Sequence, residues 1–382
     1  MVLGSYNLSI LYGLFGLAGN TERGSRSTVF PISPRPIFES WIFSQLPFKK
    51  GGIVYILLFS SLVLIFYPSS SYSTNLYKYH QVSMGTVVEI TLIGDDGEAA
   101  NQAALRAFQE IKRIETLMSP WLDSSDVTRI NRAAGKEWIK VSPETMEVIK
   151  KAQEISELSE GGFDITVGPL SELWRKAREK KTPPTVEDVK GKLDLVNYKK
   201  LGIDSEGKVL LKKKGMAMDL GGIAKGYAVD RALELLMSLG YKNMIVNAGG
   251  DLRAGGLKNN QPWSIGIQHP RDSKKILARI SVSDTAVATS GDYEKFFLDQ
   301  GKRYHHIFNP KDGFPTNGYQ SVTILCKDGM TADALATAVF VLGPEKGYPL
   351  CQKLEGVDCL MVDQEGKMII SSGLKDRISF GP

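Results

Sequence analysis

The chain has 382 residues, of which 42% are hydrophobic and 23% charged, and this ordinary globular composition excludes wholesale disorder, a collagen-like repeat and a polytopic membrane protein. The formal net charge is +5, but residues 1–80 carry six Lys/Arg against two acids, so the rest of the chain has a net charge of only +1. A nucleic-acid-binding protein usually contains a basic domain, and this near-neutral body argues against that class.

The front of the chain predicts an irregular extension followed by an export signal. Residues 1–50 are rich in Ser, Gly and Pro, and residues 51–72 contain the apolar run Ile53–Tyr67 directly after Lys49 and Lys50. A basic flank, a short apolar core and a small polar tail are typical of a secretory signal or a short membrane anchor, and a buried core helix is the alternative. Because the lysines stay in the cytoplasm, we expect the body at the inner membrane facing the periplasm, or exported after cleavage of the leader.

The body, residues 79–382, alternates predicted strands and helices. Residues 86–93 alternate apolar and polar side chains like a half-buried strand, and residues 98–118 have the apolar spacing of an amphipathic helix. A second helix is expected from about Pro143 to the glycines at 161 and 162, because proline is favourable in a first turn.

No long linker divides this body, so we predict one compact α+β unit. Residues 176–192 are charged and contain prolines, which predicts a surface excursion. Three cysteines without a CxxC pair, and four histidines without zinc-finger spacing, indicate that neither disulfides nor a zinc site defines the fold.

Seven short segments are dense in Gly, Asp, Thr and Asn, which are residues suited to ligand-binding turns. In chain order they read MGT (84–86), GGFDITVGPL (161–170), DLGGIAKGYAVD (219–230), VNAGGD (246–251), ATSGDY (288–293), HHIFNP (305–310) and ADALAT (332–337).

The third segment predicts a helix whose start can bind phosphate. Gly221 and Gly222 precede an apolar-periodic stretch, where glycines allow a close backbone approach and the helix N-terminus offers free N–H groups. Lys225 would add a positive charge one turn into this helix. The alternative is an ordinary turn before a helix, with Asp219 as a local cap.

The last two segments contain candidates for metal binding and proton transfer. Asp333 and Thr337 are four residues apart in an expected helix, so their oxygens share one face and form a hard ligand set suited to magnesium. The alternative is a helix start with Thr331 as cap. His306, next to His305, is a candidate general base because histidine titrates near neutrality; a histidine without a catalytic role is the alternative.

Taken together, in this order and at this spacing, the seven segments resemble the ApbE family, the FAD:protein FMN transferases, over about residues 79–375. The resemblance implies an α+β, T-fold-like ApbE domain with a flavin-nucleotide cleft and Mg²⁺ at the FAD diphosphate. It also implies cleavage of that diphosphate, transfer of FMN to a Thr or Ser hydroxyl of an acceptor protein, and release of AMP. The expected partners are FAD and an acceptor subunit of a membrane redox complex.

Site residues follow from the resemblance by matched position. The expected base is His306. The expected metal shell consists of Gly222 (through its carbonyl), Asp333, Ala336 and Thr337. The expected flavin-nucleotide contacts are Met84, Trp121, Gly162, Phe163, Asp164, Asp219, Lys225 and Phe308. Some members have Asp in place of Ala336 and Tyr in place of Trp121, and lipoprotein members have a cysteine after the leader that is missing here. An FAD pyrophosphatase and a non-catalytic flavin-binding protein are the alternative functions.

Overall fold

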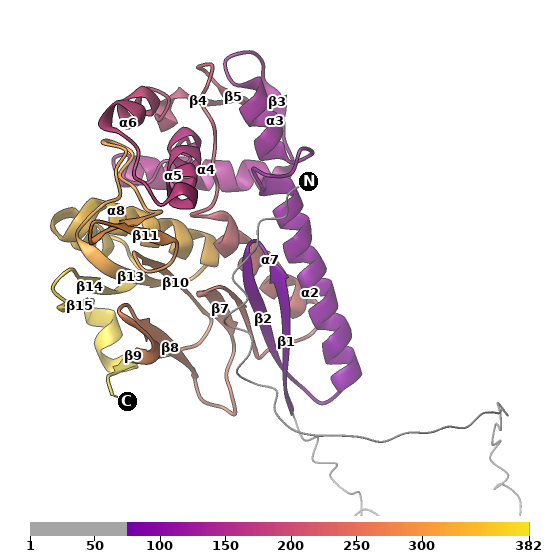
Figure 1. The fold of residues 1–382 in the computed structure, drawn as a ribbon. Coiled ribbons are helices and arrows are strands. Elements are labelled where there is room, and N and C mark those ends of the chain that lie inside the picture. Colours follow the sequence, from indigo (N-terminus) through magenta and orange to yellow (C-terminus); the bar gives the residue numbers. More distant parts are fainter. Residues whose placement is uncertain (1–74, 382) are drawn as a thin grey trace, which may run out of the picture. The chain divides into compact units, whose positions relative to one another are not determined.

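The computed structural model describes residues 75–381, and Figure 1 shows their fold. The predicted extension 1–50 and the predicted leader 51–72 lie outside the described residues and stay predictions. Within the described part of the chain, no helix combines the length and the apolar character that a membrane crossing requires.

An antiparallel sheet of eight strands forms the centre of the fold (Figure 1). Every neighbouring pair in it is antiparallel, including pairs that are far apart in the sequence, such as β2 with β6 and β7 with β10. In spatial order the strands are β1 (Asn75–Ser83), β2 (Thr86–Gly94), β6 (Met244–Ala248), β7 (Asp251–Gly255), β10 (Thr285–Gly291), β13 (Tyr319–Cys326), β14 (Asp358–Asp363) and β15 (Met368–Ile370).

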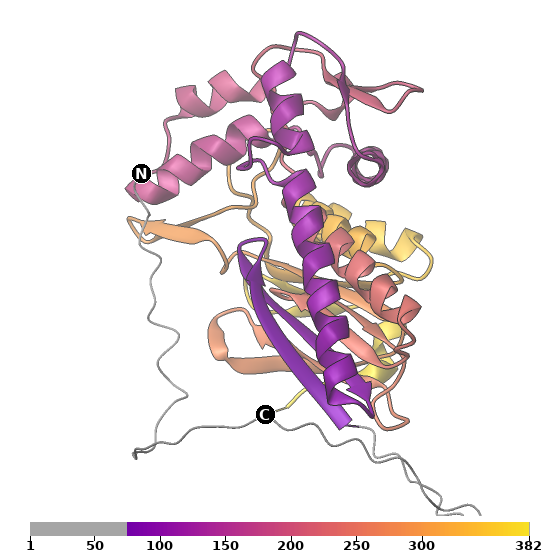
Figure 2. The ribbon, with the colours of Figure 1, turned by 90° about the vertical axis from the view of Figure 1, so that its right-hand side faces the viewer.

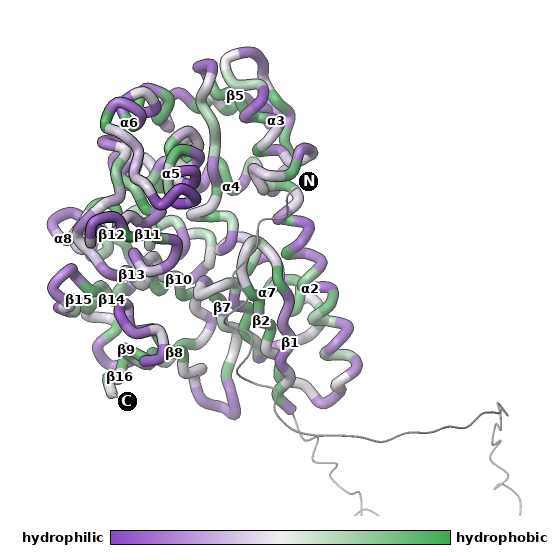
Figure 3. The backbone as a smooth tube through the Cα atoms, in the orientation of Figure 1, coloured by the Kyte–Doolittle hydropathy of each residue, from purple (hydrophilic) through white to green (hydrophobic). Residues whose placement is uncertain are grey.

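Three helices cover one face of this sheet, as the side view in Figure 2 shows. They are α2 (Gly97–Met118), α7 (Ala224–Ser238) and α8 (Gly329–Lys353), and the last is kinked at Gly343. The main core lies between these helices and the sheet, and α2 alternates hydrophobic and hydrophilic residues along its length (Figure 3). A smaller core around Trp263 and Ile280 packs a second sheet against strands of the large one. That sheet contains β8 (Trp263–His269), β9 (Asp272–Val282) and β16 (Ile378–Ser379).

The remaining elements form a cap beyond one end of the large sheet (Figure 1). Its helices are α3 (Asp126–Ala133), α4 (Pro143–Leu158), α5 (Gly168–Lys180) and α6 (Val186–Leu193). Its strands are β3 (Ile139–Lys140), β4 (Leu201–Ile203), β5 (Lys208–Leu211) and the hairpin of β11 (Phe296–Asp299) and β12 (Lys302–His305). Short 3₁₀ segments at Tyr198–Lys200 and Ser372–Arg377 complete the described elements.

This arrangement confirms the predicted α+β class, and the predicted strand at 86–93 and the helices at 98–118 and from Pro143 are all present. The segment 176–192 lies mostly at the surface, as predicted, and most of it belongs to helices α5 and α6. Only Val189 of α6 is buried, so the helix lacks the broad apolar stripe that periodicity detects. The alternative in which Thr331 caps the helix was wrong: Asp328 caps α8 by accepting from the Thr331 N–H at 2.8 Å.

Candidate functional site

The turn before α7 brings the third glycine-rich segment against the core. The backbone N–H of Asp219 donates to the carbonyl of Ile165 at 2.8 Å, and its carboxylate accepts from the N–H of Gly221 at 2.9 Å. Asp219 therefore shapes the turn, whereas the N-cap position of α7 is Ile223, without a side-chain cap. The free N–H groups expected at this helix start thus remain without a capping side chain.

Lys225, one turn into the glycine-initiated segment, lies between two buried carboxylates. Its Nζ is paired with Asp251 of β7 and lies 3.6 Å from Oδ2 of Asp333 of α8. Asp251 and Asp333 are each 4% exposed. The N–H of Gly226 also donates to Asp333 at 3.1 Å. Elements that are far apart in the sequence thus place one cation and two anions in a single cluster.

The electrostatics of this cluster follow from its burial. Burial opposes the charged form of Lys225, but the negative charges of Asp251 and Asp333 outweigh it and raise the pKa of the lysine. Burial, followed by repulsion from Asp251, raises the pKa of Asp333, although Lys225 and the Gly226 N–H act against this shift. The two carboxylates therefore depend on the lysine for neutralisation.

Thr337, Gly222 and Phe163 meet beside this cluster. A Cβ atom on Gly222 would lie 3.2 Å from Oγ1 of Thr337 and 3.2 Å from the Phe163 ring. Thr337 is one helical turn after Asp333 on α8, and its hydroxyl lies 3.2 Å from the hydroxyl of Ser290 on β10. The buried Ala336 lies between Asp333 and Thr337 in sequence. The structure therefore places Thr337 beside Gly222 and one helical turn after Asp333, and the metal shell itself stays a prediction.

His306 follows strand β12 and is surrounded by positive charge. The β11–β12 hairpin pairs Phe296 with His305, so Lys295 and His306 occupy the next facing positions beyond the ladder. His306 retains exposed surface, but many protein atoms surround its ring. The resulting desolvation is the largest cause that lowers the pKa of His306 below the usual value. Further causes are the charges of Lys295, His305, Lys225 and Arg178. His306 is consequently neutral at physiological pH, which is the form that accepts a proton.

The adjacent His305 has a structural environment. It is 4% exposed, its Nδ1 accepts from the Ile307 N–H at 3.2 Å, and its Nε2 lies 2.9 Å from the carbonyl of Thr316. These partners fix the neutral tautomer that carries its proton on Nε2. Both ring nitrogens of His305 are therefore engaged within the fold.

The other predicted flavin contacts each have a local environment of their own, and Phe163 lies against Gly222. Asp164 is buried and accepts from Thr166 and from the Tyr198 N–H at 2.7–2.8 Å, so its carboxylate orders the loop after α4. Met84 is at the β1–β2 turn with a positive φ of 51°. Trp121 is 66% exposed, and the Arg175 guanidinium lies 5.3 Å from its ring.

Gly162 and Phe308 are packed inside the protein. A Cβ atom on Gly162 would lie 3.0 Å from the side chain of Leu342, which explains why glycine fits there. Phe308 is 9% exposed and belongs to a small core with Trp174 of α5.

Four residues of the site were missed by sequence reasoning. Asp251 and Ser290 stand inside the quoted motifs VNAGGD and ATSGDY but have no local spacing that connects them to Lys225 or Thr337. Lys295 and Arg178 are charged residues in polar stretches, and only the folded chain brings their charges near His306. These four residues reach the site only through the tertiary structure, so neither periodicity nor motif spacing identifies them.

The donor set fits a magnesium ion held mainly by its substrate. Within residues 75–381, no three His, Cys, Asp or Glu side chains are grouped to hold a metal ion. Asp333 supplies one carboxylate and Thr337 one hydroxyl beside the backbone of Gly222. Magnesium is usually bound through one or two carboxylates together with substrate phosphates, so the sparse set of hard oxygens is appropriate for it.

The chain is similar to ApbE proteins in both sequence and structure. The model of the ApbE family matches residues 84–361. An FAD:protein FMN transferase of Klebsiella pneumoniae (strain 342) is 33% identical over 80% of this chain and 95% of the relative. A second, from Vibrio cholerae, is 35% identical over 78% of this chain and 91% of the relative.

Solved structures share the fold over almost their full length. The ApbE protein of Thermotoga maritima superposes with a TM-score of 0.74 at 36% identity, covering 79% of this chain and 99% of that structure. The flavin transferase ApbE of Vibrio cholerae gives a TM-score of 0.71 at 32% identity, covering 80% and 99%. These similarities span the segments that form the Lys225 cluster and contain His306.

Proposed function

The chain belongs to the ApbE family and is a transferase, and from this premise we propose that it transfers FMN from FAD to a Thr or Ser hydroxyl of an acceptor protein, with Mg²⁺ as cofactor and AMP as the second product. The observation that carries the proposal is the cluster of Lys225, Asp333 and Thr337 beside Gly222. The neutral His306 is near enough for the charge of Lys225 to lower its pKa. Together they combine a site for a cation and phosphate with a group able to accept a proton.

Phosphoryl transfer depends mainly on positioning and on neutralising charge, and the residues of the cluster are suited to both tasks. Lys225, Lys295 and Arg178 would attract and orient the diphosphate of FAD. Magnesium, when bound by Asp333, Thr337 and the Gly222 carbonyl, would polarise the diphosphate and offset the charge on departing AMP. His306 would take the proton from Oγ of the acceptor residue as that oxygen attacks the FMN phosphorus.

Asp333 provides a direct test of the proposed metal shell. It is the only carboxylate in that shell, so Asp333→Ala should lose transfer, and raised Mg²⁺ should restore it only in part. Asp333→Asn, which keeps the shape but removes the charge, should also be impaired. If Asp333 served only the start of α8, both folded variants would turn over near the wild-type rate at low Mg²⁺, with a stability loss of about 1 kcal/mol.

The alternative of an FAD pyrophosphatase uses the same groups with water as the acceptor. The two reactions separate when AMP and free FMN are counted with and without an acceptor domain. The proposed transferase should release AMP in step with labelled acceptor and leave little free FMN. Equal amounts of AMP and free FMN, independent of acceptor, would instead identify the pyrophosphatase.

We further propose an extracytoplasmic location at the membrane, with an acceptor that is a subunit of a membrane redox complex. The support for this location is the sequence of residues 49–72, a basic pair followed by a short apolar run. An exported enzyme would meet the exported domains of such a complex.

A further inference from the structure

Helices α7 and α8 are in backbone contact at a pair of glycines. A Cβ atom on Gly226 would lie 2.0 Å from the carbonyl oxygen of Gly329, and one on Gly329 would lie 2.7 Å from the carbonyl oxygen of Gly226. Any larger residue would push the helices apart, because the clashing atoms belong to the backbone. The first turns of both helices therefore meet without side chains between them.

Two buried aspartates exchange hydrogen bonds across this contact. Asp333 of α8 accepts from the Gly226 N–H of α7 at 3.1 Å. In return, Asp230 of α7 accepts from the N–H groups of Gly329 at 2.7 Å and Met330 at 2.9 Å. Each aspartate follows its own glycine by four residues, in GYAVD (226–230) and GMTAD (329–333), so both helices present the same Gly-x-x-x-Asp pattern. We call this arrangement the reciprocal clasp.

Strand β7 supports the clasp with two ion pairs, in which it contributes one acidic and one basic side chain. Asp251 pairs with Lys225, and Nη1 of Arg253 lies 3.0 Å from Oδ1 of Asp230. Asp251 and Arg253 are two residues apart, so their side chains lie on one face of the strand. Burial raises the pKa of Asp230 to about 6, so its carboxylate is ionised in neutral and mildly alkaline solution.

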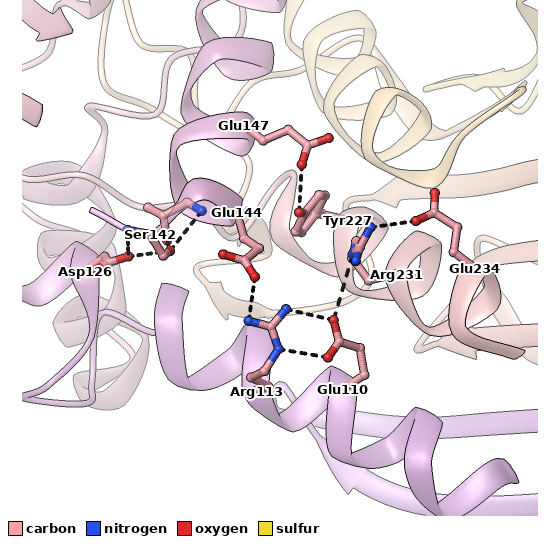
Figure 4. Close-up of polar contacts among 10 residues, drawn as sticks. Glu110, Arg113, Asp126, Ser142, Glu144, Glu147, Tyr227, Arg231 and Glu234 are labelled. Carbon is pink, nitrogen blue, oxygen red and sulfur yellow. Dashed lines mark hydrogen bonds and ion pairs between the residues drawn. The ribbon is translucent and has the colours of Figure 1, made fainter. Parts of the chain in front are cut away.

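The other side of α7 is fixed to α2 and α4, as Figure 4 shows. The Tyr227 hydroxyl donates to Glu147 of α4 at 2.8 Å, and Nε of Arg231 lies 3.8 Å from Glu110 of α2. Arg113 of α2 in turn joins Glu110 to Glu144 of α4. Helix α7 is thus anchored on two sides, and the clasp sets where the start of α8 lies against it.

We propose that Asp230 is a positioning residue that holds the first turn of α8 so that Asp333 and Thr337 face Gly226 and Gly222. The mechanism uses Asp230 at no other point, and its hydrogen-bond partners lie one turn before Asp333. The proposal rests on the proposed function only for its consequence in catalysis. Its structural content, that Asp230 controls the Asp333–Gly226 contact, stands independently and is tested separately.

The test compares Asp230→Asn with Asp328→Asn, a matched control that removes one carboxylate from the same helix N-terminus. Asp328 caps α8 through the Thr331 N–H, and within residues 75–381 its side chain has no hydrogen bond or ion pair to α7, although its negative charge acts on Asp230. Asparagine is as good a cap as aspartate, so Asp328→Asn should change little. In Asp230→Asn, an amide N–H₂ replaces one of the two acceptor oxygens and faces an N–H donor or Arg253, which loosens the clasp.

The first readout is amide hydrogen exchange of Gly226 without FAD or metal. Exchange should be about tenfold faster in Asp230→Asn and within about twofold of wild type in Asp328→Asn. A purely local role would deprotect Gly329 and Met330 and leave Gly226 protected. Unchanged protection of Gly226 in folded Asp230→Asn would overturn the proposal, whatever reaction the enzyme catalyses.

The second readout is the Mg²⁺ concentration that gives half-maximal quenching of bound FAD fluorescence and half-maximal transfer. Both should rise about tenfold in Asp230→Asn and stay near wild type in the control. If wild-type protein shows no Mg²⁺-dependent transfer, the proposed function fails while the exchange result still decides the clasp. Should Asp230→Asn not fold, Asp230→Glu keeps the charge but displaces the carboxylate by one methylene from the Gly329 and Met330 N–H groups, and unchanged Gly226 protection in that folded variant would contradict the proposal.

Discussion

Replacement of Lys225 by Met tests whether this lysine neutralises the two buried carboxylates. The change removes the charge and keeps a flexible apolar side chain, so Asp251 and Asp333 would be left facing each other without a cation. Removing one partner of a buried ion pair costs about 3–5 kcal/mol. The Lys225 side chain remains 28% exposed, which allows some solvent screening, so we expect the lower end, about 3 kcal/mol.

The assay is urea unfolding followed by far-UV circular dichroism in metal-free buffer. Lys225→Met should lower the unfolding midpoint, and Asp251→Asn in the same chain should recover a large part of the loss because one of the two unbalanced charges is gone. Burial raises the pKa of Asp333, so folded Lys225→Met gains from proton uptake as the pH falls. The stability difference from wild type should therefore be smaller in mildly acidic than in alkaline buffer.

Two results would refute this reasoning. One is a stability loss below about 1 kcal/mol in Lys225→Met, which is the size expected for an exposed ion pair. The other is a second substitution, Asp251→Asn, that adds to the loss. Either would mean that solvent, rather than Lys225, neutralises the carboxylates.

Three further predictions address the base, its electrostatic neighbour and export. His306→Ala should keep FAD binding, measured by fluorescence quenching, but slow transfer by about 10²–10⁴-fold, and an unchanged rate would exclude it as the base. The acid limb of the pH–rate profile should lie below pH 6.5, the usual pKa of histidine. Lys295→Met should move this limb to higher pH, because the positive charge of Lys295 helps to lower the pKa of His306. Lys302→Met, at an exposed lysine of the same hairpin, is the control, and an equal shift there would contradict the assignment. A C-terminal reporter that is active only in the cytoplasm should stay silent when fused to the full chain, whereas a signal would argue against export through Ile53–Tyr67.

Much of the fold was predictable because its main helices and strands bury one face. The apolar spacing of α2 and α4 and the alternation of β2 reflect that burial directly. Helix α6 was not predictable in this way, since its contact with the core is made by Val189. The cap of α8 was misplaced by three residues because Asp and Thr are both good caps, and only the backbone shows which one is used.

The site was predictable where its chemistry is local in sequence. Asp333 and Thr337 share a helix face, and Gly222 and Lys225 flank one helix start, so motif and spacing were sufficient to select them. Asp251 and Lys295 were not selected, because the first reaches Lys225 through the sheet order and the second reaches His306 through the register of the β11–β12 hairpin. Pairings between distant segments leave no periodic signal in a single sequence.

The most direct test of the central claim is covalent labelling of an acceptor. The purified enzyme is incubated with FAD, Mg²⁺ and an acceptor domain that the Vibrio cholerae relative is first shown to flavinylate, and the mixture is separated on a denaturing gel and analysed by mass spectrometry. We predict a fluorescent acceptor band that carries the mass of FMN, equimolar AMP, and loss of both in chelator or in Asp333→Ala. An unlabelled acceptor under conditions in which the relative labels it fully would contradict the account.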